Sequence, residues 1–154
     1  MSINVNDFYC SYGMIMTNYN HITNLLCGII LGIYHIRGGL LYEKYCEGYI
    51  QDVCYMDFYT KTTNFDELSD SLPSDIWKKH SVTKLLDDLK KVAEWFDPLG
   101  GKLVIEDIED EPINNLNEDD LFTYRLMNEF LLSRIGELSN LYQAIKDMLE
   151  KTED

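Results

Sequence analysis

Positive charge is scarce in this sequence of 154 residues. Thirteen lysines and arginines stand against twenty-seven aspartates and glutamates, so the formal net charge at pH 7 is −14. Such a surplus repels phosphates and anionic lipids. Nucleic-acid binders depend on a basic stripe that releases counterions, whereas the one local group of lysines, in 78–91, is interrupted by Asp87 and Asp88. We therefore expect no direct binding to nucleic acid.

Patterns of cysteine and histidine that bind metals are also missing. The four cysteines, at positions 10, 27, 46 and 54, contain no Cys-x-x-Cys pair, and the three histidines lack zinc-ligand spacing. Buried free thiols are the simpler interpretation, and they favour a reducing compartment. The N-terminal stretch also lacks the basic region and apolar run of a secretory signal. We expect a cytoplasmic protein without a metal site.

Long apolar runs are absent as well. The longest, Leu25–Tyr34, has ten residues, whereas a membrane span needs about 20. Within it, Gly28 and Gly32 are spaced four apart, which in lipid favours helix dimerisation and in a helical bundle allows a neighbouring helix to approach closely. The short run favours the bundle interpretation, and we expect no membrane contact.

Local motifs for catalysis or ligand binding are not found. The stretch 106–120 has no glycine, which an EF-hand loop requires, and neither Gly-Gly pair lies in a phosphate-loop context. His21-Ile-Thr23 has the form of one half of a twin His-x-Thr phosphoesterase arrangement, but the second half is missing. Five acids without the spacing of a carboxylate metal site are better explained as solvated helix faces. These are Glu43, Glu47, Asp52, Asp87 and Asp88. We assign no catalytic residue and no cofactor, and a non-enzymatic function is favoured.

Helical periodicity is what the sequence contains in abundance. In the stretch 14–36, seven apolar residues follow one another at spacings of four and three, which places them on one face of a helix. They are Ile15, Tyr19, Ile22, Leu26, Ile29, Ile33 and Ile36. Other apolar residues widen this face, so we predict a central helix that several elements contact.

The same periodicity predicts three more helices. One covers 41–54 after Gly38-Gly39, one covers 82–96, and a long one starts at Asn117 or Glu118 and extends to Leu149, with a break at Gly136 left open. Ser74 and Ser81 are N-cap candidates for helix starts in the second half of the chain.

Three segments do not follow this period. Residues 1–13 are expected to form an extended arm or short strand, and 55–73 the end of a helix followed by a loop. Residues 102–108 alternate in the manner of a strand. The predicted fold is therefore mainly α: a single helical domain, 1–154, built as a bundle of about four main helices with a long C-terminal helix and at most a small β element near 102–108. Short connections favour antiparallel neighbours in such bundles.

Negative charge is concentrated in one stretch. Residues 103–124 carry eight acids and no base, although the helix at 78–91 mixes both signs. Acids at 118–120 stabilise a helix start by roughly 0.3 to 1 kcal/mol each, but this does not explain the acids at 106–111. We predict that all eight contact a basic protein partner. They are Glu106, Asp107, Glu109, Asp110, Glu111, Glu118, Asp119 and Asp120.

The function that these features favour is an acidic protein-binding module that occupies a basic surface of a partner protein. Phage or viral antagonists of host nucleic-acid-binding or defence proteins are of this kind, as are immunity-type inhibitors. Eleven tyrosines supply anchors suited to protein interfaces. Two alternatives stay open: a small helical enzyme with a carboxylate-based site that no motif reveals, and a structural module that self-associates as a homodimer through the Gly28 and Gly32 face or the terminal helix.

The substitution Ile29→Asp tests the predicted central helix. It places an unpaired charge on the most apolar face of the sequence, at a cost of several kcal/mol, and we expect the protein to unfold. Circular dichroism and thermal melting measure the effect. A variant with unchanged melting would contradict the assignment of this helix.

Overall fold

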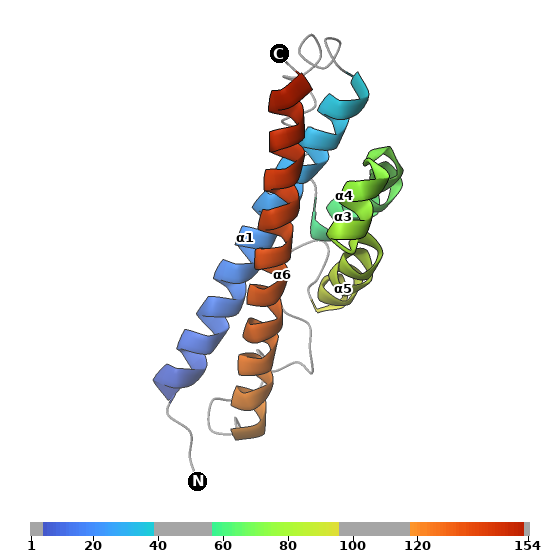
Figure 1. The fold of residues 1–154 in the computed structure, drawn as a ribbon. Helices are drawn as coiled ribbons and strands as arrows, with labels where there is room; N and C mark the ends of the chain where they lie inside the picture. The colour runs from blue at the N-terminus through green and yellow to red at the C-terminus, as the bar shows by residue number, and fades with distance from the viewer. Residues whose placement is uncertain (1–4, 39–56, 96–117, 153–154) are drawn as a thin grey trace.

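This computed structural model describes residues 5–38, 57–95 and 118–152 of the chain (Figure 1). The described helices are, in order, α1 (Val5–Gly38), α3 (Phe58–Leu68), the short 3-10 helix η1 (Ser69–Ser71), α4 (Ser74–Lys79), α5 (Val82–Glu94) and α6 (Glu118–Thr152). No strand occurs within these three segments. The predicted mainly α bundle with a long C-terminal helix is confirmed. The predicted helix 41–54 and the predicted strand 102–108 lie outside the described residues.

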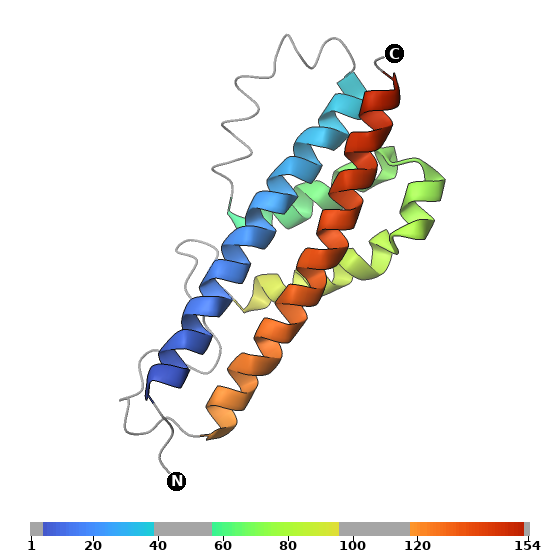
Figure 2. The same ribbon diagram turned by 60° about the vertical axis from the view of Figure 1, so that its left-hand side comes forward.

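The two long helices, α1 and α6, form the main interface of the described fold (Figure 1). They lie side by side and run in the same direction (Figure 2). Near the start of each helix, the rings of Tyr12 and Tyr124 have centroids 6.1 Å apart, and toward the ends Gly32 faces Ile145. Short connections predict antiparallel neighbours, but residues 39–117 separate these helices and allow the parallel arrangement.

The buried faces of α1 and α6 are those that the periodicity predicts. On α1, Ile15, Ile22, Leu26, Ile29 and Ile33 are fully buried, whereas Tyr19 and Ile36 are half-buried at the edges of the face. On α6 the corresponding row is buried from Leu121 to Ile145 except for the half-buried Tyr142. Burying each such aliphatic side chain contributes about 1.5 to 3 kcal/mol. α6 is continuous through Gly136, so the break considered there does not occur.

Gly28 and Gly32 allow the C-terminal halves of α1 and α6 to approach closely. A Cβ atom at position 28 would lie 2.7 Å from Cε2 of Tyr142, and one at position 32 would lie 2.8 Å from Cγ2 of Ile145. Both separations are shorter than van der Waals contact, so only glycine fits without a shift of the neighbour. The bundle interpretation of this glycine pair is confirmed. Self-association through the same face would require α6 to move away from it.

Two buried amides fix the register between α1 and α6. The Asn18 Nδ2 group donates to Oδ1 of Asn128 at 3.1 Å, and the Asn128 Nδ2 group donates to the backbone carbonyl of Ser11 at 3.0 Å. A buried polar group without its partner costs about 1 to 3 kcal/mol. A shift of one helical turn along the interface would therefore be penalised.

Two predictions about the flanking segments are wrong. Residues 5–13 are expected to be extended but form the first turns of α1, where Tyr12 packs on Tyr124 of the distant α6.

The second wrong prediction concerns 55–73, which is expected to be the end of a helix followed by a loop. Within it, residues 58–68 form the separate helix α3, and Asp57 caps the start of α3 by accepting from the Thr60 N–H at 2.6 Å. The buried face of this segment has spacings of four and three but includes polar members, which a count of apolar residues misses. The row at this spacing is Phe58, Thr62, Phe65, Ser69 and Leu72, and Lys61 and Leu68 are buried beside it.

The shorter helices α3, α4 and α5 form a second layer on one side of α1 and α6 (Figure 2). Phe58 of α3 packs on Tyr19 of α1 with ring centroids 5.4 Å apart, and burial together with the negative charge of Asp57 raises the pKa of the Tyr19 phenol. The predicted helix 82–96 is confirmed over 82–94. α4 and α5 begin at Ser74 and Val82, but neither Ser74 nor Ser81 caps a helix through its side chain.

Gly32→Ala and Gly136→Ala form a matched pair that tests the close approach of α1 and α6. Alanine at 32 meets the buried Ile145, and overpacking costs about 1 to 3 kcal/mol, which exceeds the helix-propensity gain of about 1 kcal/mol. Alanine at 136 meets nothing within 4 Å, so only the gain remains. We expect urea unfolding to show the first variant less stable and the second more stable than the parent. Equal stabilisation of both would contradict the packing.

Candidate functional site

The acids predicted to bind a partner fall into two groups. Glu118, Asp119 and Asp120 form the first turn of α6, as predicted, and this end of α6 lies beside the start of α1 (Figure 1). Acids in the first turn stabilise the positive end of the helix dipole. The other five lie outside the described residues. These five are Glu106, Asp107, Glu109, Asp110 and Glu111.

Most of the negative charge lies outside the described helices. The described segments contain sixteen acids and eleven bases, a net charge of −5, so the other segments carry −9 of the total of −14. The five acids between 106 and 111 supply more than half of that remainder. The described helices are therefore nearly balanced, and the charge surplus belongs mainly to connecting and terminal segments.

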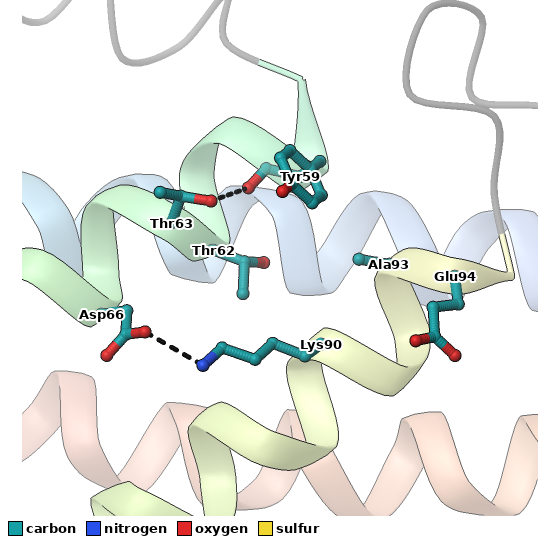
Figure 3. A pocket seen from close by; sticks show the side chains of 7 residues that line it. All are labelled: Tyr59, Thr62, Thr63, Asp66, Lys90, Ala93 and Glu94. Atoms are coloured by element: carbon teal, nitrogen blue, oxygen red, sulfur yellow. Dashed lines mark hydrogen bonds and ion pairs between the residues drawn. The ribbon is translucent and has the colours of Figure 1, made fainter.

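A pocket of about 350 Å³ lies between α3 and α5 (Figure 3). The two helices run antiparallel here, so the start of α3 lies near the end of α5 (Figure 2). Tyr59, Thr62, Thr63 and Asp66 line it from α3, and Lys90, Ala93 and Glu94 line it from α5. Sequence reasoning missed this site because 55–73 was assigned to the end of one helix followed by a loop, and not to the separate helix α3. The helical spacing of Phe58, Thr62 and Phe65 could have revealed this site. It becomes visible only when threonine is counted among the residues that can be buried.

An ion pair spans one side of this pocket. The Lys90 Nζ group lies 3.0 Å from Oδ2 of Asp66, and both side chains are about half exposed. The hydrogen bond to Asp66 and the charge of Asp66 raise the pKa of the Lys90 ammonium group. Because solvent screens such a pair, its contribution to stability is small. As a result of this ion pair, the Lys90 ammonium group already occupies one of the two carboxylate oxygens of Asp66.

A second pocket, of about 280 Å³, lies between α4 and the last turns of α6. Charges of both signs line it, with Asp75 and Lys79 on α4 and Asp147 and Lys151 on α6. His80 also lines this pocket, and burial, with a smaller effect of Lys79, lowers the pKa of its imidazole. Because charges of both signs line this pocket, it favours neither anionic nor cationic ligands.

A buried ion pair links α5 to α6. Arg134 Nη1 donates to Oδ2 of Asp88, and both side chains are almost fully buried. Arg134 Nη2 also lies 3.1 Å from Oε1 of Glu137, and the guanidinium lies 5.2 Å from the centroid of the Phe130 ring. The assignment of both Asp87 and Asp88 to a solvated face is therefore wrong for Asp88, although Asp87 is exposed. An arginine 46 residues away supplies the partner, which local spacing does not reveal.

The described residues offer no cluster of ligands for a metal. No group of three histidine, cysteine or acidic side chains in 5–38, 57–95 and 118–152 is close enough to hold an ion. The His21-Ile-Thr23 sequence lies within α1, where the Thr23 hydroxyl donates to the Tyr19 carbonyl at 2.9 Å. His21 is exposed on α1 and His80 lies in the second layer after α4, so they form no catalytic pair.

Comparison with known proteins identifies no relative. No protein-family model, curated protein or solved structure matches this chain. Among the described helices, none combines the length and the apolar character that crossing a bilayer requires.

The Arg134 and Asp88 pair predicts a non-additive response to mutation. Arg134→Met leaves the buried Asp88 carboxylate without its cation, and we expect a loss of about 3 to 5 kcal/mol in the free energy of unfolding. Combining it with Asp88→Leu removes both charges, and we expect much of this loss to be recovered. Urea unfolding of the parent, both single variants and the double variant measures the coupling. Additive losses would show that the pair is not coupled.

Proposed function

We propose that this protein is an acidic binding module that occupies a basic surface of a partner protein. The observation that carries the proposal is the segregation of charge: eight acids and no base between 103 and 124, in a chain whose described helices are nearly balanced. A surface that only needed to be soluble would not require acids to be collected in one stretch. Collected charge steers association with an oppositely charged site and suppresses wrong partners.

The described fold supports this proposal by anchoring one end of the acidic stretch. Glu118, Asp119 and Asp120 are followed at once by Leu121 and Tyr124, both buried. The first turn of α6 therefore leads directly into the core, which ties one end of the acidic stretch to the described fold.

An inhibitor or antagonist is the form of this function that the chemistry favours. A module that covers a cationic surface competes with whatever anionic ligand that surface normally binds, including nucleic acid. Phage or viral antagonists of host defence proteins and immunity-type inhibitors act in this way.

Neutralising the acids at 106–111 tests the proposal. Partners are first captured from a lysate of the native host at low and high salt, and a basic protein retained only at low salt is expected. In the test variant, the five acids are replaced by their amides, and we expect the association rate at low salt to fall about tenfold, with a weaker salt dependence. The five are Glu106, Asp107, Glu109, Asp110 and Glu111.

A second variant controls for net charge. It replaces three exposed glutamates and two exposed aspartates of the described helices by amides, which gives the same change of charge elsewhere on the molecule. These are Glu67, Asp70, Asp87, Glu129 and Glu150. We expect this variant to lose much less association rate. Equal losses in both variants, or capture of no basic protein at low salt, would overturn the proposal.

A further inference from the structure

One side of α6 exposes three large apolar side chains. Phe122 is 61% exposed, Leu126 48% and Leu132 50%. Single exposed apolar residues are ordinary on a protein surface, but helical spacing places these three within about one third of the circumference of α6, over about three turns. They are half of the large apolar residues that are exposed in the described segments. A patch of this kind is typical of a surface that contacts another protein.

This side of α6 points away from the other described elements. α6 meets α1 through Tyr124 and Asn128, and it meets the second layer through Phe130 and Arg134. The remaining side of the helix, about one third of its circumference, is here called the outer face. Its members, all exposed, are Phe122, Arg125, Leu126, Glu129, Leu132, Ser133 and Gly136.

The same side of α6 is polar beyond Gly136. Its exposed residues there are Asn140, Gln143 and Asp147. Polar residues along the whole helix would serve solubility equally well, so the restriction of apolar side chains to the first half indicates a local contact.

The charges of the outer face complement each other. Arg125 and Glu129 lie about one turn apart near its centre, and neither forms an ion pair with another described residue. Together they carry no net charge, although the whole chain carries −14. In a pair of copies, the arginine of each can therefore meet the glutamate of the other. A uniformly basic or acidic partner would instead oppose one of the two residues with a like charge.

The shape of the outer face also fits a second copy. In an antiparallel pair with a twofold axis at Glu129, Phe122 lies level with Gly136 of the other copy, because both are seven residues from the axis. Gly136 has no side chain, and a Cβ atom there would meet nothing within 4 Å. It therefore leaves space for the phenylalanine ring. Leu132 lies close to the level of Arg125 of the other copy, whose apolar stem can cover it.

We propose that the outer face of α6 binds a second copy of this chain, in an antiparallel dimer with its twofold axis at Glu129. Three apolar side chains per copy are few compared with a stable dimer, which buries about 1,200 to 2,000 Å², so the dimer is weak and reversible. The inference does not depend on the proposed function. It places the acidic first turns of the two α6 helices roughly 30 Å apart along the pair, where one dimer can engage two basic sites.

Sedimentation velocity of the full-length protein tests the dimer. The concentration is varied from about 5 to 300 µM, in about 0.15 M salt, which screens the repulsion between the two net charges more than it screens contact pairs. We expect a reversible monomer–dimer equilibrium with a Kd of the order of tens of micromolar. A monomer at every concentration would overturn the proposal, and it is the result expected if another segment of the chain or a different protein covers the outer face.

An exchange of the two central charges tests the geometry. Arg125→Glu leaves only acids at the centre of both copies, and we expect the dimer to weaken at least about tenfold. Adding Glu129→Arg restores opposite charges in reversed order, and we expect the Kd to return to within about threefold of the parent. Lys146→Glu makes the same change of net charge at an exposed position of α6 outside the outer face. Equal weakening by Arg125→Glu and Lys146→Glu, or no recovery in the double variant, would contradict the dimer.

A second pair of variants tests the apolar contact. Leu126→Gln removes apolar area from the outer face, and we expect the dimer to weaken about fivefold. Tyr59→Gln replaces an exposed ring on α3, and we expect it to leave the Kd within about twofold of the parent. Circular dichroism checks that every variant folds. A dimer that is insensitive to Leu126→Gln, or equally sensitive to Tyr59→Gln, would rule out the outer face as its interface.

Discussion

The parallel interface between α1 and α6 is the constraint on which the rest of the described structure depends. Its apolar rows bury most of the core, and its register is set by the Asn18–Asn128 amide pair. Gly28 and Gly32 then bring the backbones close enough for Tyr142 and Ile145 to fill the remaining space. Apolar packing alone would allow α6 to shift along α1. The buried amide pair and the close fit at the two glycines allow very little shift.

The second layer is attached to both long helices by different chemistry. α3 meets α1 through the Tyr19 and Phe58 rings, and α5 meets α6 through the buried Arg134–Asp88 pair. Trp95 adds an edge-to-face contact with Phe130. α3 and α5 also pack directly on each other, and the ion pair between Asp66 and Lys90 spans the pocket between them. None of the residues that line this pocket belongs to the interface between α1 and α6.

Sequence reasoning succeeded where an unbroken row of apolar residues marks the buried face, even though a few polar residues are buried beside it. The rows of α1, α5 and α6 are of this kind, and their predicted helices are confirmed. It failed for α3, whose buried face includes Thr62 and Ser69, and for residues 5–13, whose helical conformation depends on packing against the distant Tyr124. It also missed the burial of Asp88, since the compensating Arg134 lies on another helix. Of the eight acids predicted to bind a partner, the three at 118–120 form the first turn of α6 and the other five lie outside the described residues, so their contact with a partner stays a prediction.

The order of the helices along the chain has a consequence for synthesis. α1 is translated before residues 39–117, whereas the long helix that packs on its apolar face, α6, is translated after them. Contacts between such distant segments form slowly, because a long loop must close before they contribute. During that interval the isoleucine face of α1 stays exposed and is prone to aggregation. A nascent chain should therefore depend on chaperone protection until α6 has been translated.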